Sequence, residues 1–221
     1  MNQAKRGLLI FDLDGTLFRT DICSVRALES VFRDRGLGAP RRDEWIGLFG
    51  RPDRDFVEWL DEHAGAGLGE SLLAEIAQRE LGMVPHEGKL FPGVRESLAA
   101  LRSRVEQMSI CSNGPEPYVR TVLSSTGIGA YFDAVRWRQA DDLSKSDMIA
   151  DLLARLPARP AIVIGDRRED VDAAHATGIP AIGAAYGYGG AGELDEADAV
   201  VSSPAEVPGA VAGLLRARES Y

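Results

Sequence analysis

Two carboxylates follow an apolar run near the start of the sequence. In the segment FDLDGTLF (residues 11–18), Asp12 and Asp14 come directly after residues 7–11, which are typical of a buried strand. Two acids at the end of a buried strand cost free energy unless something there needs negative charge, such as a divalent cation. The pair alone is weak evidence, because acids at strand ends also face water or cap helices.

Further polar groups follow later strand-like runs. Ser112 and Asn113 come at the end of SIC, Lys145 opens a helical stretch, and Asp166 and Asp170 lie in GDRRED after AIVIG. Taken singly, Ser112 could be a helix N-cap, Lys145 a solvated helix residue and Asp170 a first-turn acid. Taken together, carboxylates suit Mg²⁺, while a hydroxyl and a lysine suit the oxygens of a phosphoryl group.

Strand-like runs alternate with amphipathic helical stretches along most of the chain. Strands are predicted at residues 8–11, 108–111, 134–137, 161–164, 179–183 and 199–201. Helices are predicted between them at residues 94–103, 118–125, 146–156 and 171–177. This order predicts an α/β fold, a Rossmann-like parallel sheet with helices on both faces. The carboxyl ends of parallel strands share one edge, so the polar groups should converge there.

One stretch interrupts the alternation. Residues 19–89 contain no convincing strand and three or four helices, one of which should end at Gly82. We therefore expect an inserted helical cap at 19–89, and a catalytic core formed by 1–18 and 90–221. The prolines and glycines of residues 83–93 indicate a hinge between the two parts. The helically spaced aromatic residues are predicted to form the core of the cap: Trp45, Phe49, Phe56 and Trp59.

The composition limits the partners and the location of the protein. A formal net charge of -9 and a pI near 4.9 argue against nucleic acids and anionic membranes as partners. The two cysteines, Cys23 and Cys111, make neither a disulfide framework nor a metal site. Apolar runs are too short for a signal peptide or a membrane span, so we expect a cytoplasmic protein, either a monomer or a homodimer.

Four of these segments, in this order, resemble the motifs of the haloacid dehalogenase superfamily. DLDGT resembles the first motif, SICSN the second, Lys145 the third and GDRRED the fourth. FPGV at 91–94 and TGIPAIGAAYGYG at 177–189 are similar to phosphoglycolate-phosphatase-like members that carry a helical cap. The resemblance covers nearly the whole chain, and it implies a phosphatase that acts through an aspartyl-phosphate.

The resemblance also implies roles for individual residues. Asp12 would be the nucleophile that attacks phosphorus, and Asp14 would protonate the leaving alkoxide and later deprotonate the attacking water. Mg²⁺ would be held by Asp12, the backbone carbonyl of Asp14 and Asp166, with Asp170 as a further ligand or as an acid that orients the site. The groups that would hold the phosphoryl oxygens are Ser112, the backbone N–H of Asn113 and Lys145.

The substrate is expected to be a small phosphorylated metabolite, for example phosphoglycolate. Specificity should come from the cap, chiefly from Arg51 and Arg54 in the segment GRPDRD, although either could simply form a surface ion pair. A sugar phosphomutase of the same superfamily would share every core residue. A receiver-like protein or a non-catalytic phosphate-binding relative is the other alternative.

Two local features have no assigned function. Gly187, Gly189 and Gly192 match G-x-G-x-x-G, but no second βαβ unit and no acidic partner follow, so a dinucleotide site is not expected. Arg167 stands where members of the superfamily usually carry a small or hydroxyl residue, and it would either crowd the metal or bind the substrate.

Overall fold

The computed structural model describes residues 5–139, 141–142 and 144–217. Within these residues, one six-stranded parallel sheet has the order β3-β2-β1-β4-β5-β6. The strands are β1 (Leu8–Phe11), β2 (Gln107–Ser112), β3 (Ala134–Trp137), β4 (Ala161–Gly165), β5 (Ala181–Ala184) and β6 (Ala199–Val201). The helices that cover the sheet are α5 (Val94–Arg102), α6 (Glu116–Thr126), α7 (Lys145–Arg155), α8 (Arg168–Ala176) and α9 (Val207–Ala217). The predicted α/β fold class is thereby confirmed.

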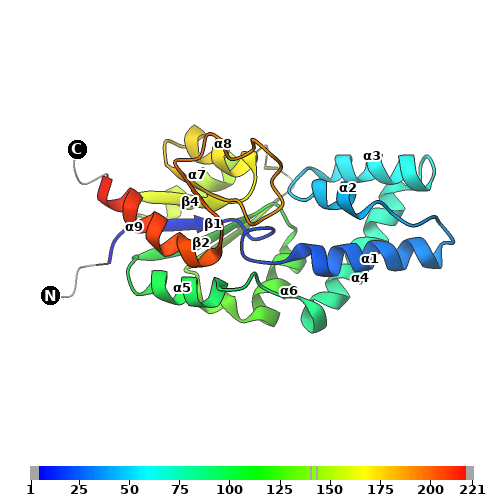
Figure 1. Ribbon diagram of the computed structural model, residues 1–221, viewed down its shortest axis with the longest axis horizontal. Coiled ribbons are helices and arrows are strands. Elements are labelled where there is room, and N and C mark those ends of the chain that lie inside the picture. Colours follow the sequence, from blue (N-terminus) through cyan, green and yellow to red (C-terminus); the bar gives the residue numbers. More distant parts are fainter. Residues whose placement is uncertain (1–4, 140, 143, 218–221) are drawn as a thin grey trace.

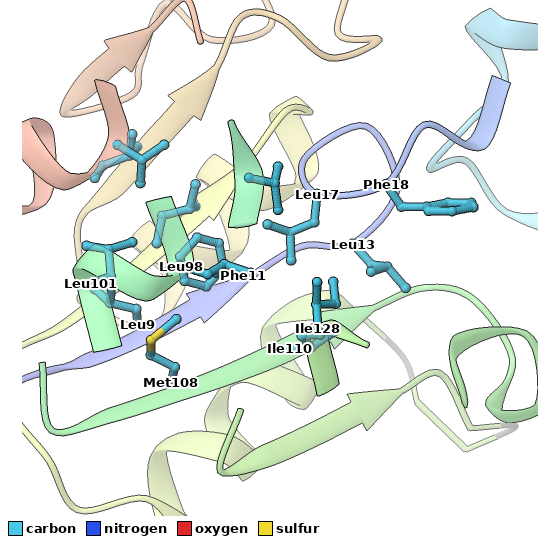
Figure 2. Close-up of a cluster of buried hydrophobic side chains, with 14 of the residues drawn as sticks. Leu9, Phe11, Leu13, Leu17, Phe18, Leu98, Leu101, Met108, Ile110 and Ile128 are labelled. Atoms are coloured by element: carbon cyan, nitrogen blue, oxygen red, sulfur yellow. The ribbon is translucent and has the colours of Figure 1, made fainter. Parts of the chain in front are cut away.

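Side chains of β1 alternate between two apolar layers, as a strand covered on both faces requires. Leu9 and Phe11 pack with residues of α5, α6 and α9, in the cluster that Figure 2 shows. Leu8 and Ile10 pack on the other face with residues of α7 and α8. Because all four side chains are almost completely buried, β1 is fixed at the centre of the sheet and its carboxyl end is a rigid platform.

The start of β5 differs from the prediction. The strand begins at Ala181, whereas the sequence predicted residue 179. Pro180 has no N–H to donate to a neighbouring strand, although its carbonyl accepts the N–H of Val163 at 3.0 Å. The other predicted strands and the helices of the core lie within three residues of the observed bounds at each end.

Four helices follow β1 and lie together at the end of the molecule opposite the termini (Figure 1). They are α1 (Thr20–Asp34), α2 (Arg42–Gly47), α3 (Asp53–Ala64) and α4 (Gly69–Glu87), here called the helical segment. Its own apolar core includes Trp45, Phe49 and Trp59, with Phe56 packed against them, as the sequence predicted. The boundaries of a separate cap domain stay a prediction. None of the helices in the described ranges has the length and apolar character needed to span a bilayer.

Helix α4 corrects two expectations. It passes through Gly82 and Pro85 and ends at Glu87, so residues 83–87 are helical and not part of a hinge. Val84 explains the extension, because it packs into the same apolar cluster as β1 and is only 1% exposed. Gly88 is the C-cap residue that follows the helix, and a Cβ atom there would lie 2.6 Å from the carbonyl oxygen of Val84.

Candidate active site

Three polar residues meet where the three central strands end. Asp12 follows β1, Ser112 is the last residue of β2, and Asp166 follows β4. Because Phe11 pairs with Ile110 on one side and with Ile164 on the other, these strand ends lie at the same edge of the sheet. The sheet topology thus brings together residues that are far apart in sequence.

Lys145 is a buried part of this site and not a solvated helix residue. It is the first residue of α7, whose start is fixed by a capping box between Ser144 and Asp147. Its side chain is 4% exposed, and Nζ donates a hydrogen bond of 2.6 Å to Oδ1 of Asp12. Nζ also lies 2.6 Å from Oδ1 of Asp170, an ion pair without the alignment of a hydrogen bond. Burial lowers the pKa of Lys145, but the charges of Asp12 and Asp170 outweigh it and raise the pKa, which keeps the ammonium charged.

Three carboxylates surround this lysine. Asp12, Asp166 and Asp170 are buried, and one carboxylate oxygen of each lies within 4.8 Å of the others. Burial and repulsion from Asp170 raise the pKa of Asp166 to about 7. Burial also raises the pKa of Asp12, against the opposing effect of Lys145. One ammonium does not balance three buried acids, so the arrangement calls for a further cation.

The donor set fits a hard divalent cation. Oδ2 of Asp170 accepts the N–H of Arg167 at 3.0 Å and so caps α8, whereas Oδ1 has no hydrogen bond in the described structure. Asp170, the third residue of α8, therefore caps the start of the helix with one carboxylate oxygen and contributes the other oxygen to the acid cluster. Carboxylate oxygens converging in this way are the ligands that Mg²⁺ prefers.

Glycines pack directly against Asp166. A Cβ atom at Gly15 or Gly187 would lie 2.2 or 2.3 Å from the side chain of Asp166, and one at Gly189 would lie 2.1 Å from its carbonyl oxygen. The N–H of Tyr188, between the last two glycines, donates to Oδ2 of Asp166 at 2.7 Å. Gly187 and Gly189, the first two glycines of the G-x-G-x-x-G match, therefore let the backbone lie close enough to Asp166 to orient its carboxylate.

Asp14 is not part of the cluster of three acids and has hydrogen-bond partners of its own. Its Oδ1 accepts hydrogen bonds from Thr20 Oγ1 at 2.5 Å and Tyr118 OH at 2.6 Å, and its Oδ2 accepts one from Ser112 Oγ at 3.4 Å. Burial raises the pKa of Asp14, while the hydrogen bonds from Thr20 and Tyr118 lower it in part. Sequence reasoning missed Thr20 and Tyr118, and the only available signal was that each lies in the first turn of a helix that follows a motif.

Ser112 does not cap α6. That helix begins at Glu116 with Pro115 at the N-cap position. The Ser112 hydroxyl instead accepts the N–H of Gly114 at 3.0 Å, which turns the chain at the end of β2 and holds the hydroxyl beside Asp14.

Asn113 connects the core to the helical segment. Its Nδ2 donates to Glu169 Oε2 at 2.8 Å and to the carbonyl oxygen of Gly50 at 3.3 Å. Arg167 makes a second connection, since its Nη2 donates to the carbonyl oxygen of Gly47 at 3.4 Å. Its Nε lies 3.1 Å from Glu193, so the guanidinium is engaged at the junction with the helical segment.

A cavity of about 470 Å³ separates the strand ends from the helical segment. Asp12, Asp14, Asn113, Lys145 and Asp170 line it from the core. Trp45, Phe49, Arg51, Phe56 and Glu80 are among the residues that line it from the helical segment.

The two predicted arginines differ in position. Arg51 lines the cavity, whereas Arg54 is not among its described lining residues. The Arg54 side chain is 79% exposed and pairs with Asp55, so the structure does not bring it to the site. Glu80 was missed, because an acid in the middle of an amphipathic helix carries no sequence signal.

A family model identifies the family of this chain, and curated proteins and solved structures show further similarity. The family model described as "Haloacid dehalogenase-like hydrolase" matches residues 9–184. The chain is 33% identical over 200 residues to a phosphoglycolate phosphatase of Yersinia pestis, covering 84% of this chain and 83% of that protein. It is 32% identical over 209 residues to the tyrosine-protein kinase PtkA of Mycobacterium tuberculosis, covering 88% and 67%. Among solved structures, the haloacid dehalogenase-like protein SP0104 of Streptococcus pneumoniae superposes with a TM-score of 0.82 at 22% identity, covering 94% and 98%.

Proposed function

The chain belongs to the haloacid dehalogenase-like hydrolase family and is a phosphatase of that family, and we propose that it hydrolyses a small phosphomonoester with Mg²⁺ through an aspartyl-phosphate. The observation that carries the proposal is the buried group formed by Asp12, Lys145, Asp166 and Asp170 at one sheet edge. Relatives named phosphoglycolate phosphatase make phosphoglycolate the first ester to test. The cytoplasmic location and the monomeric or homodimeric state stay predictions.

The proposed first step is attack of an Asp12 carboxylate oxygen on phosphorus. The P–O bond to the leaving alcohol breaks, and Asp14 supplies the proton to the alkoxide. The pKa of Asp14, which burial raises, suits a group that must hold a proton before the reaction. Tyr118 and Thr20 fix the position of that carboxyl group in the cavity through their hydrogen bonds.

In the second step a water molecule attacks phosphorus in the aspartyl-phosphate. Asp14, now ionised, accepts the proton of that water, and Asp12 is released as a carboxylate. Lys145, Ser112 and the N–H of Asn113 would hold the phosphoryl oxygens during both steps. We propose that the helical segment acts as a cap that shields the intermediate from bulk water.

The metal would be held by Asp12, Asp166 and Asp170, with the backbone carbonyl of Asp14 as the remaining protein ligand. When bound, Mg²⁺ supplies positive charge that offsets the negative charge of the acids and of the phosphoryl group.

Chelation of divalent metal is expected to abolish hydrolysis of para-nitrophenyl phosphate, and Mg²⁺ should restore it. Asp166→Asn should raise the Mg²⁺ concentration for half-maximal activity by more than about tenfold, because it removes a ligand charge. Mg²⁺ should also raise the melting temperature of the wild type more than that of Asp166→Asn. Full activity in chelator, or equal metal responses of the two proteins, would contradict the metal assignment.

The products distinguish the remaining alternatives. A phosphatase releases inorganic phosphate in equal amount to the ester consumed, with sustained turnover. A phosphomutase would convert a sugar phosphate to its isomer, and a receiver-like protein would stop after one phosphorylation. Because one relative is named a tyrosine kinase, phosphate release should be measured beside transfer of a phosphoryl group from ATP to tyrosine.

Arg51→Ala is expected to raise KM for small phosphate esters by a few-fold, whereas Arg54→Ala should leave it unchanged. Arg51 presents its positive charge to the cavity, but its side chain is 52% exposed and the effect is therefore screened. Arg54 is a matched control, since it pairs with the same Asp55 outside the cavity. A KM of Arg51→Ala equal to that of the wild type would show that Arg51 does not attract the substrate, and a KM raised equally in both variants would show that the effect is not specific to the cavity.

A further inference from the structure

Glu80 is an acid that the proposed mechanism does not use. It lies on α4 and lines the same cavity as Asp12 and Asp14. Its Oε1 is buried and has no hydrogen-bond partner among the residues that the structure describes. Burial and the charge of Asp14 raise the pKa of Glu80 to about 8, although a hydrogen bond with Ser24 opposes the shift. A cation bound beside Glu80 would stabilise the ionised carboxylate form. A buried carboxyl oxygen without a donor is costly unless a ligand supplies one.

The neighbouring protein groups do not supply the missing donor. The Ser24 hydroxyl accepts the indole N–H of Trp45 at 3.1 Å, so its single proton is the one available to Glu80. The indole donor is used in that contact, and Ser24 has nothing left for the second carboxyl oxygen. Trp45, Ser24 and Glu80 form one connected wall of the cavity.

The rest of this wall is apolar and aromatic. Trp45 and Phe56 pack edge to face with their ring centres 5.0 Å apart, and both line the cavity together with Phe49. Aromatic rings beside a carboxylate favour a cation with apolar surface, because the ring faces attract positive charge while the ring carbons exclude water.

The two ends of the cavity thus differ in charge preference. The core end offers Lys145 and a candidate metal site, which suit a phosphoryl dianion. The end formed by the helical segment offers Glu80 and aromatic rings. We propose that the leaving alcohol of the substrate carries a cationic amine, which binds at Glu80 beside Trp45 and Phe56.

This inference rests on the proposed phosphatase function and narrows its substrate class to phosphomonoesters of amino alcohols. An ester with a carboxylate in the leaving group, such as phosphoglycolate, would bring another acid beside Glu80 and Asp14 and could not form this charge pair. A substrate with a phosphoryl group at one end and an ammonium group at the other would complement the charge at both ends of the cavity.

The test compares three esters by kcat/KM: phosphoethanolamine, propyl phosphate, which has a methyl group in place of the ammonium group, and phosphoglycolate. The first two have nearly the same shape and differ in the charged N–H donor. We expect phosphoethanolamine to exceed propyl phosphate by about tenfold or more, and phosphoglycolate to be the poorest. Equal values for the first two, or a preference for phosphoglycolate, would overturn the inference.

Two variants test the acidic part and the aromatic part of the cavity wall separately. Glu80→Gln and Phe56→Leu should each remove most of the advantage of phosphoethanolamine while leaving propyl phosphate and para-nitrophenyl phosphate unchanged. Glu70→Gln is the matched control, because Glu70 is exposed on the same helix. An equal loss for all esters in Glu80→Gln would show a merely structural role and contradict the inference.

A binding measurement separates this inference from the proposed reaction. Calorimetric titration of Asp12→Asn with phosphoethanolamine and with propyl phosphate should show tighter binding of the cation. If no ester is hydrolysed but the cation binds more tightly, the proposed function fails and the amine site stands. If para-nitrophenyl phosphate is hydrolysed but both ligands bind equally, the amine site fails and the phosphatase stands.

Discussion

Asp12→Asn is expected to reduce phosphatase turnover below about 1% of the wild-type rate, because an amide neither attacks phosphorus nor carries charge to a metal. The fold should persist, since Lys145 keeps its ion pair with Asp170 when the charge of Asp12 is lost. Removing one of three mutually repelling buried acids should leave the melting temperature unchanged or raise it. Steady-state hydrolysis of para-nitrophenyl phosphate and a thermal melt measure the two effects.

A second readout identifies the nucleophile directly. Intact-protein mass spectrometry after rapid acid quench should show one added phosphoryl group on the wild type and none on Asp12→Asn. Asp172→Asn is the matched control, because Asp172 is exposed on α8 and should retain both turnover and the phosphorylated species. Turnover above a few per cent in a folded Asp12→Asn protein would show that another group attacks phosphorus.

Lys145→Ala is expected to slow phosphoryl transfer by about a hundredfold or more, the usual effect of removing a group that stabilises charge in the transition state. Lys145 is a buried cation that contacts both Asp12 and Asp170. Without its positive charge, the repulsion between these two carboxylates is no longer offset. We therefore expect the variant to be less stable than the wild type when metal is absent, and Mg²⁺ to recover part of that stability. Single-turnover kinetics and thermal melts with and without Mg²⁺ measure these effects.

Lys145→Met separates lost charge from lost volume. Methionine keeps an unbranched apolar side chain in the buried space, so a similar loss of rate in both variants would assign the effect to the ammonium group. Lys145→Arg keeps the charge but adds a larger planar group, and it should recover activity in part at most. An unchanged rate in folded Lys145→Ala would reduce Lys145 to a structural ion-pair partner and weaken the proposed mechanism.

The sequence by itself determined the fold class and the members of the acid cluster. Asp12, Ser112 and Asp166 each follow an apolar run long enough for one strand, and alternation with helices makes those strands parallel. Parallel strands place their carboxyl ends at one edge, so three local patterns were enough to predict a shared site. Local sequence patterns were therefore sufficient to predict that these three residues lie at the same edge of the sheet.

Tertiary contacts decided the rest. Helix α4 continues past Gly82 because Val84 packs into the apolar core of the sheet, a contact that no local propensity encodes. Asp14 accepts a hydrogen bond from Tyr118, which lies 104 residues away in the sequence, and this contact forms only because α6 packs beside the end of β1.

The cavity wall gives the clearest contrast. Glu80 looks like any polar position of an amphipathic helix, and only the packing of α4 over the strand ends buries it beside Asp14. The glycines at 187 and 189 resemble a nucleotide-binding loop in sequence, yet in space they make room for Asp166. A local sequence pattern predicts which residues lie at the end of a helix or strand. Which side chains of different elements come into contact depends on long-range packing, and no local pattern predicts it.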